Sequence, residues 1–381
     1  MRILFTTNPL YGHLYPMLPL MNAARRADHE VIVATGANFA PEVERHGFAI
    51  WSVGPSAQQV RAQSATTDDD PPMDQLGQMV EAGMRLFGRP GIARARDLTP
   101  LAAEWQPDLV VHELTEAAGW QAAAVSGAID VMHGFGTHIP YLVDAMQIVL
   151  GAVRSELGRS DRSRDLTDVP YVDPCPPLLQ PPGGTPFGNV LPLRPEMGVV
   201  HPGEEPPESM RNLPYEKTVY LTLGTAFNVP QLLAQAIDAV RDLQDNVIIT
   251  TGPGVDPSSF GPVPPHIAMA AFVPQALILK HCSAVVSHTG SGTMLGALGD
   301  GLPQVCLPMG ADQFSNSDQI ARTGAGIVVP PDARTPQTIR AAIEEVLDNP
   351  SYVAGARVLQ ADIAAMPSAN EVLTRVVALA R

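Results

Sequence analysis

Short apolar, β-branched runs alternate with longer stretches of helical period, and this alternation constrains the fold more than any other feature. The runs cover 3–7, 30–35, 49–53 and 109–113 in the first half and 218–224, 246–252, 267–272, 284–288, 304–308 and 326–330 in the second. Helical stretches in the second half cover 230–243, 292–300 and 336–348. Strands that alternate with helices form parallel sheets covered on both faces. We therefore expect an α/β protein with two doubly wound parallel sheets.

A proline-dense tract at about 169–214 separates the two halves. Its prolines include Pro174, Pro176, Pro177, Pro181, Pro182, Pro206 and Pro207. Proline lacks the backbone N–H and cannot continue a helix, so we expect irregular chain and a linker here. The 381 residues exceed the ~250 to 300 at which single cores split. We expect a first domain at 1–205, a second at 215–360, and a C-terminal helix at 361–381 that packs back on the first. Within the first domain, a loop is expected at 64–72.

Charge and composition exclude several classes of protein. The chain has 24 Lys and Arg against 39 Asp and Glu, a net charge of −15, so a nucleic-acid partner is not expected. No window approaches the ~18 apolar residues of a membrane span. The N-terminus has the pattern of a strand rather than a signal peptide, and three widely spaced cysteines form neither a disulfide framework nor a CxxC site. A cytoplasmic protein is therefore expected. No metal is expected either, since no His, Asp and Glu residues show metal-ligand spacing.

Two polar residues of the first half follow predicted strands. His13, within Gly12-His13-Leu14-Tyr15-Pro16, comes after the first strand, at the edge where open α/β sheets bind ligands, and an imidazole there can act as a general base. Glu113 ends another strand and could orient the His13 imidazolium. Glu116, one helical turn further on, could do so instead. Helix capping is the alternative role for all three.

The second half contains a strand, a glycine turn and a helix start at 284–293. Such a turn presents backbone N–H groups and a helix dipole to an anion, and His288 could add a donor. The run is neither a P-loop nor G-x-G-x-x-G, and it is not a nucleophile elbow. A packing role for the glycines is the alternative.

Two further strand ends of the second half carry ligand-binding side-chain types. Phe272 could stack on a nucleobase while the backbone after it, at Val273 and Gln275, contacts the base edge. Asp312 and Gln313 could bind hydroxyl groups. Singly, a phenylalanine is usually a core residue and Asp-Gln a helix start. Three successive strand ends that offer partners for base, phosphate and hydroxyl groups form a stronger pattern.

These residues resemble a known family. The stretch at 272–316, FVPQALILKHCSAVVSHTGSGTMLGALGDGLPQVCLPMGADQFSN, resembles the donor-sugar signature of the family 1 glycosyltransferases, which include bacterial enzymes that decorate macrolides and enediynes. Gly12-His13 with Pro16, and the run at 219–225, resemble the same family. The resemblance implies the GT-B fold, in which two Rossmann-like domains face each other across a cleft that holds the active site.

The resemblance also assigns roles to residues. His13 matches the base that deprotonates the acceptor hydroxyl, and Glu113 takes the place of an aspartate, one methylene shorter, that supports it. Gly296 stands where plant members carry a ribose-binding glutamate, which favours the bacterial branch and a dTDP over a UDP donor. The donor-binding matches are Thr225 near the diphosphate, Phe272 in the place of a stacking tryptophan with Val273 and Gln275, His288 on the diphosphate, the phosphate turn Gly290, Ser291, Gly292 and Thr293, and Asp312 and Gln313 on the sugar.

The expected activity is inverting, metal-independent and cofactor-independent transfer of a deoxysugar to a hydroxyl of an apolar natural-product aglycone. Soft and aromatic side chains suited to such an aglycone, or to plain core, are Met79, Met84, Phe87, Phe135, Tyr141 and Met146. A sugar-nucleotide epimerase or hydrolase of the same fold and a non-catalytic nucleotide-sugar-binding protein are the alternatives. The sequence leaves open a homodimer and the need for an auxiliary activator protein.

Overall fold

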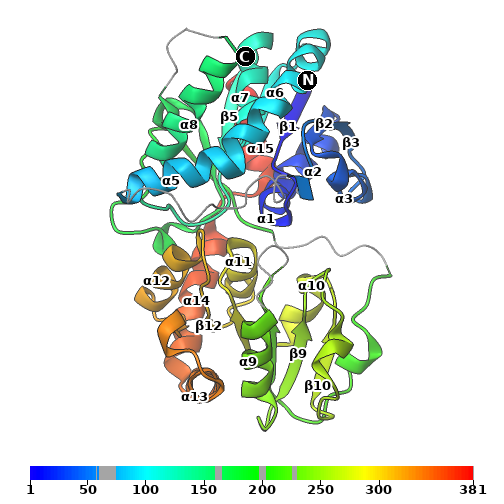
Figure 1. Ribbon diagram of the computed structural model, residues 1–381, viewed down its shortest axis with the longest axis vertical. Coiled ribbons are helices and arrows are strands. Elements are labelled where there is room, and N and C mark those ends of the chain that lie inside the picture. Colours follow the sequence, from blue (N-terminus) through cyan, green and yellow to red (C-terminus); the bar gives the residue numbers. More distant parts are fainter. Residues whose placement is uncertain (57, 60–73, 159–164, 197–202, 225–229, 381) are drawn as a thin grey trace. The chain divides into compact units, whose positions relative to one another are not determined.

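The computed structural model describes residues 1–56, 58–59, 74–158, 165–196, 203–224 and 230–380. The chain divides into two compact units. Unit 1 comprises Met1–Pro174, Thr185–Leu193 and Pro367–Arg381, and unit 2 comprises Cys175–Gly184 and Arg194–Met366. Each contains one parallel sheet with helices, which confirms the expected α/β class (Figure 1). The loop expected at 64–72 lies outside the described residues.

Unit 1 is built on a seven-stranded parallel sheet in the order β3-β2-β1-β4-β5-β6-β7. Its strands are β1 (Arg2–Thr6), β2 (Glu30–Thr35), β3 (Ala49–Ser52), β4 (Leu109–Glu113), β5 (Ile129–His133), β6 (Tyr171–Asp173) and β7 (Val190–Pro192). Its helices are α1 (Tyr11–Leu14), η1 (Tyr15–Met17), α2 (Leu18–Arg26), η2 (Ala37–Phe39), α3 (Ala40–Arg45), α5 (Gln75–Gly83), η3 (Met84–Gly88), α6 (Arg89–Trp105), α7 (Ala117–Ser126), α8 (Leu142–Glu156), η4 (Leu166–Asp168) and α15 (Ala369–Ala378).

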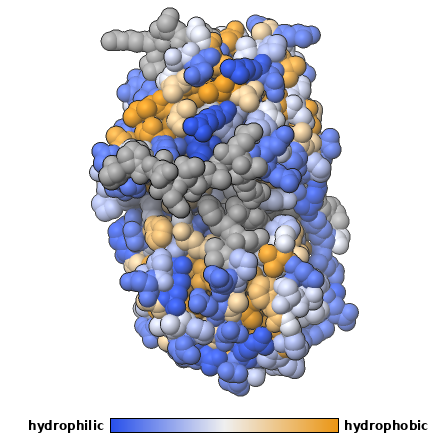
Figure 2. Space-filling view, in the orientation of Figure 1, coloured by the Kyte–Doolittle hydropathy of each residue, from blue (hydrophilic) through white to orange (hydrophobic). Residues whose placement is uncertain are grey.

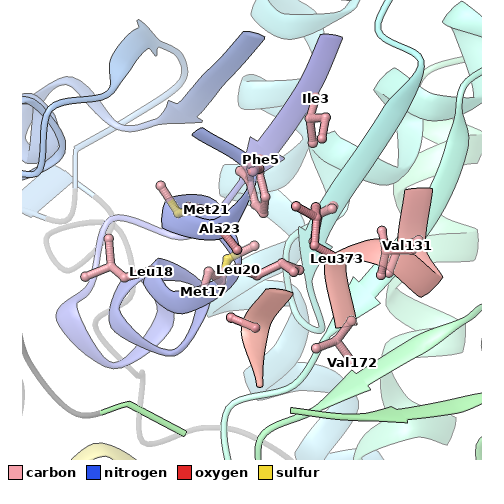
Figure 3. Packing of buried hydrophobic residues seen from close by; sticks show 14 of the residues in the cluster. Ile3, Phe5, Met17, Leu18, Leu20, Met21, Ala23, Val131, Val172 and Leu373 are labelled. Carbon is pink, nitrogen blue, oxygen red and sulfur yellow. The ribbon is translucent and has the colours of Figure 1, made fainter. Parts of the chain in front are cut away.

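The apolar run of β1 is buried on both faces of this sheet. Ile3 and Phe5 belong to the core on the side of α2 and α15, while Leu4 belongs to the core on the side of α6 and α7. Figure 3 shows Leu373 of α15 among side chains of β1, α2, β5 and β6. This two-sided burial explains why the strand has no polar alternation.

The expectation of irregular chain across the whole proline-dense tract is wrong for its first part. Tyr171–Asp173 and Val190–Pro192 form β6 and β7 of the unit 1 sheet. Strand β6 can form because its own residues include no proline; Pro170 and Pro174 lie on either side of it. Pro192 is tolerated because β7 is the edge strand, where an N–H can be missing without loss of a ladder bond.

The segment expected as a single C-terminal helix at 361–381 is divided in the structure. Its first residues complete α14 (Pro350–Ala365) in unit 2. After Pro367 the chain belongs to unit 1, where Ser368 and Glu371 form a capping box that starts α15. Helix α15 then contributes Val372, Leu373 and Val376 to the core beside α2.

Unit 2 has a six-stranded parallel sheet in the order β10-β9-β8-β11-β12-β13. Its strands are β8 (Thr218–Thr222), β9 (Asn246–Thr250), β10 (Ile267–Ala270), β11 (Ala284–Ser287), β12 (Gln304–Cys306) and β13 (Gly326–Val328). Its other helices are η5 (Pro177–Leu179), η6 (Glu208–Met210), α9 (Pro230–Val240), η7 (Pro257–Phe260), α10 (Gln275–Ile278), η8 (Leu279–His281), α11 (Ser291–Gly299), α12 (Gln313–Arg322), η9 (Pro331–Ala333) and α13 (Pro336–Asp348). No helix in the described ranges is long and apolar enough to cross a membrane.

Both sheets reverse their strand order beside the first strand of the unit. In unit 1 the reversal lies between β1 and β4, and in unit 2 it lies between β8 and β11. Doubly wound sheets bind ligands beyond the carboxyl ends of the strands at such a switch point. The residues that follow these four strands are therefore the first candidates for function.

Candidate active site

His13 and Glu113 meet at the switch point of unit 1. Thr6 of β1 pairs in register with His112 of β4, so the tips of these two strands lie side by side. His13 lies on α1, directly after β1, and its Nδ1 is 2.9 Å from Oε2 of Glu113. This is an ion-pair distance, although the angle falls short of a hydrogen bond. The His13 side chain is 16% exposed and that of Glu113 is fully buried, so the imidazole stands between solvent and the carboxylate.

The Glu113 carboxylate is surrounded by hydrogen-bond donors. It accepts from Asn8 Nδ2 at 2.9 Å, from Thr115 N at 2.8 Å and from Thr115 Oγ1 at 2.9 and 3.0 Å. Burial alone would raise the pKa of Glu113, but the charge of the nearby His13 and the hydrogen bonds from Thr115 outweigh it and lower the pKa. The ionised group can stabilise an imidazolium at His13. The longer glutamate side chain therefore reaches the ring.

Glu116, the alternative partner, serves another role. Its carboxylate caps α7, with Oε1 3.1 Å from Ala118 N and Oε2 2.7 Å from Gly119 N. Oε1 also lies 3.0 Å from Nε of Arg94 in an ion pair whose side chains are both 1% exposed. Among the two glutamates, the structure places Glu113 and not Glu116 beside His13.

Aromatic rings flank His13 in unit 1. The Phe87 and Phe135 ring centroids lie 5.9 and 5.4 Å from that of His13. Phe135 also lines a small pocket with Leu114, Gly136, Thr137, His138, Ile139, Leu142, Tyr171 and Phe187. The two rings give an apolar wall beside the imidazole.

The six side chains suggested for the acceptor do not share one environment. Met146 is buried in a core that includes α8, and Met84, Phe87 and Phe135 pack against that core. Phe87 and Phe135 also lie beside the His13 ring. Met79 is half-buried on α5, and Tyr141 is 47% exposed. Figure 2 shows apolar surface over the part of unit 1 where α5 and α8 lie in Figure 1. The aromatic contacts with the His13 ring thus come from Phe87 and Phe135.

A second histidine beside Glu113 is fully buried. His133 pairs with Glu113 between β5 and β4, and its Nδ1 lies 2.6 Å from the carbonyl oxygen of Gly134. Burial lowers the pKa of His133 to about 4, against the opposing effects of that bond and of Glu113. The ring stays neutral and has no solvent access, so it does not compete with His13 as a base.

His133 predicts a pH dependence of stability. In the unfolded chain its pKa is about 6.5, so between that value and about 4 the unfolded state binds more protons and stability falls as the pH falls. From about pH 7 to about pH 5 this amounts to about 2 kcal/mol. The free energy of unfolding is measured with urea at both pH values for wild type and for His133→Gln. The decrease from pH 7 to pH 5 should be about 2 kcal/mol smaller in the variant. Equal losses in the two proteins would contradict the assignment.

His288 occupies the switch point of unit 2, between two glycines. It follows β11, while Gly224 follows the neighbouring strand β8. A Cβ on Gly224 would lie 2.5 Å from His288 Cε1, and one on Gly290 would lie 2.5 Å from Nε2. Real Cβ atoms do not approach so closely, and Gly224 also has φ +79°. Both positions therefore need glycine to seat the imidazole.

His288 is a neutral group in the folded protein. Burial lowers its pKa to about 4, although the Asp312 carboxylate acts in the opposite direction. Its Nδ1 has no hydrogen-bond partner among the described residues. A neutral imidazole carries one N–H group, which can donate to a ligand oxygen.

The carboxylate of Asp312 is bound at the N-terminus of α11. Oδ2 of Asp312 accepts from Ser291 N at 3.2 Å, from Ser291 Oγ at 2.7 Å and from Asn316 Nδ2 at 2.9 Å. Gly290 precedes α11, and Gly292 and Thr293 lie in its first turn. Gln275 Nε2 donates to Thr293 Oγ1 at 2.9 Å. The geometry demonstrates that this helix end binds carboxylate oxygen, as helix N-termini do.

The remaining donor-site candidates are placed differently. Phe272 is 42% exposed, as a stacking platform must be, whereas the Val273 side chain is buried in the core and leaves only its backbone to a ligand. Gln313 is buried, and its Oε1 accepts from Met309 N and Gly310 N at 2.7 and 3.2 Å. Thr225 lies outside the described residues. Within the described ranges, no three His, Cys, Asp or Glu side chains gather as metal ligands would.

Sequence reasoning missed Asn8, Thr115 and Arg94, which surround the two glutamates. Asn8 carried a usable signal, since it is a polar residue directly after a predicted strand. Thr115 follows Glu113 by two residues. Arg94 carried none, because it is one of three arginines in α6 and an arginine is usually a surface residue.

Comparison with known proteins identifies the family of the chain. Residues 22–189 and 234–379 match the N-terminal and C-terminal domains of the family described as erythromycin biosynthesis protein CIII-like. The L-demethylnoviosyl transferase of Streptomyces niveus is 31% identical over 97% of this chain and 95% of its own length. The structure of glycosyltransferase VinC in complex with dTDP has a TM-score of 0.78 at 26% identity, covering 100% of this chain and 99% of that one.

A second solved structure gives the same result. The glycosyltransferase SsfS6 of Streptomyces sp. SF2575, complexed with thymidine diphosphate, has a TM-score of 0.81 at 25% identity and covers 99% of both chains. The fold of both units is therefore that of the GT-B enzymes. The chain belongs to the erythromycin biosynthesis protein CIII-like family and is a natural-product glycosyltransferase.

Proposed function

We propose that this enzyme transfers a sugar from a dTDP-sugar to a hydroxyl of an apolar aglycone, with inversion at the anomeric carbon and without a metal ion. The observation that carries the proposal is the content of the two switch points. In unit 1 the switch point holds a partly exposed imidazole on a buried carboxylate, and in unit 2 it holds a glycine-flanked histidine beside a helix N-terminus. The first arrangement is suited to accept a proton, and the second is suited to bind an anion.

Unit 1 supplies the base in this proposal. The acceptor hydroxyl gives its proton to Nε2 of His13 while its oxygen bonds to the anomeric carbon. The ionised Glu113 stabilises the imidazolium that forms. The rings of Phe87 and Phe135 give the acceptor an apolar surface at the base.

Unit 2 holds the donor. The bond from the anomeric carbon to the diphosphate oxygen breaks, and negative charge grows on the leaving dTDP. The N–H groups at the start of α11 and the neutral His288 stabilise that charge. A single displacement from the face opposite the leaving group inverts the anomeric carbon. The dTDP in the VinC and SsfS6 structures supports the choice of nucleotide.

A substrate panel tests the proposed function. Mass spectrometry of incubations that combine dTDP-sugars and UDP-sugars with macrolide, anthracycline and related aglycones should detect a glycoside only where an aglycone is present. Consumption or isomerisation of donor without aglycone would instead indicate a hydrolase or an epimerase. Donor binding with no turnover across the panel would indicate a binding protein.

Metal independence gives a separate prediction. We propose that the N-terminus of α11 and His288 stabilise the charge of the diphosphate, so transfer rates should stay within about twofold after EDTA treatment. The rate is measured before chelation, after it, and after Mg²⁺ or Mn²⁺ is returned. Loss of activity in EDTA with recovery on addition of metal would refute the proposal that protein groups suffice.

A further inference from the structure

Asn8 joins the Glu113 carboxylate to a buried arginine. Its Nδ2 donates to Glu113 Oε2 at 2.9 Å and to Thr115 Oγ1 at 3.0 Å, and its Oδ1 accepts from Nη2 of Arg94. Asn8 is 3% exposed and Arg94 is 1% exposed. Arg94 is itself held by Glu116, through Nε at 3.0 Å. A continuous buried chain of polar contacts thus runs from Glu116 through Arg94 and Asn8 to Glu113 and His13.

The chemistry of Arg94 fixes which way the Asn8 amide points. A guanidinium has five N–H donors and no acceptor, so only the amide oxygen of Asn8 can face it. The amide NH₂ must then face Glu113 and Thr115. Thr115 Oγ1 has a single proton, and because it accepts from Asn8 it is free to give that proton to Glu113. Every group around the carboxylate is therefore oriented as a donor.

We propose that Asn8, locked by Arg94, is a positioning residue that holds the Glu113 carboxylate toward Nδ1 of His13 and so keeps the proton of the neutral imidazole on Nδ1. The role in catalysis rests on the proposed function, because it leaves Nε2 as the free base. Neither Asn8 nor Arg94 forms a hydrogen bond with the His13 ring within the described part of the chain. Their effect passes through Glu113.

Asn8→Asp separates this role from packing. The variant keeps the shape of the side chain and can still accept from Arg94, but it places a carboxylate oxygen where Nδ2 lies 2.9 Å from Oε2 of Glu113. Two carboxylates so close cannot both stay ionised. Arg94 stabilises the charge on the new aspartate, so the proton goes to Glu113, which then no longer favours N–H on Nδ1 of His13.

The test is ¹⁵N NMR of histidine-labelled protein at about pH 8.5, roughly two units above the ordinary histidine pKa. His13→Gln assigns the His13 signals, and the shifts of its two nitrogens report which one carries the proton. Wild type should show the proton on Nδ1, and Asn8→Asp should move the major tautomer to Nε2–H. Asn22→Asp is the matched control and should leave the signals unchanged, since Asn22 also faces an arginine of unit 1, Arg25, but lies away from Glu113.

Asn8→Ala is the second variant, for the case that Asn8→Asp does not fold. It removes all three hydrogen bonds of the Asn8 side chain and should also raise the Nε2–H population. The turnover number of either variant should fall about tenfold to a hundredfold with KM little changed, part of the effect of a general base. Retention of the wild-type tautomer in a folded Asn8 variant would overturn the inference. Full activity of His13→Ala would overturn the proposed function instead. The tautomer measurement does not depend on turnover and would still decide the role of Asn8.

Discussion

Replacing His13 by alanine should lower the turnover number by roughly 10²- to 10⁴-fold, which is the usual contribution of a general base. The acceptor hydroxyl would then have no nearby group to take its proton, while Glu113 remains fully buried. The dissociation constant for dTDP should not change, because the residues proposed to bind the diphosphate belong to unit 2. Steady-state kinetics measures the first quantity and titration calorimetry the second.

The matched control for this variant is His281→Ala. His281 is an exposed histidine at the end of η8 and lies outside both switch points. Its loss should leave turnover and dTDP affinity at their wild-type values. A His13→Ala enzyme that turns over at the control's rate would show that the base lies elsewhere.

Gly224→Ala should weaken dTDP binding by about tenfold or more. The added methyl would lie 2.5 Å from the His288 ring, closer than any real contact, and the residue would keep φ +79°, which L side chains rarely adopt. The ring must therefore move, and the neutral donor beside α11 moves with it. Calorimetric titration with dTDP measures the loss.

Gly261→Ala separates the steric effect from backbone strain. Gly261 belongs to unit 2 and has φ +72°, but none of the described atoms lies within 4 Å of the position its Cβ would take. This variant should lose roughly 1 to 3 kcal/mol of stability from strain and retain wild-type dTDP affinity. If Gly224→Ala binds dTDP as tightly as Gly261→Ala, His288 is not part of the donor site.

The sequence predicted the strands best where apolar residues run without interruption. Strand β4 begins and ends where expected, because Leu109, Val110 and Val111 fill cores on both faces of the sheet. Strands β6 and β7 could not be predicted in the same way. Each is three residues long, too short for a periodic pattern, and prolines surround both. Their pairing depends on the edge of a sheet that forms from distant residues.

The candidate site shows the same division between local and long-range information. His13 and His288 were predicted because each follows a strand in the sequence. The choice between Glu113 and Glu116 required the structure, since only two residues lie between the end of β4 and the cap of α7. The burial of Arg94 and its bond to Asn8 join residues 86 positions apart, which no local pattern encodes.

The most direct test of the account is a time course of the anomeric proton signal of a dTDP-sugar by ¹H NMR, recorded with enzyme alone and after addition of an aglycone that the panel identifies. The account predicts that the donor signal persists with enzyme alone, because the deprotonated acceptor is the nucleophile. After the aglycone is added, the donor signal should be replaced by a glycoside signal of opposite anomeric configuration. Decay of the donor signal without aglycone, or a product that keeps the donor's configuration, would contradict a single displacement assisted by His13.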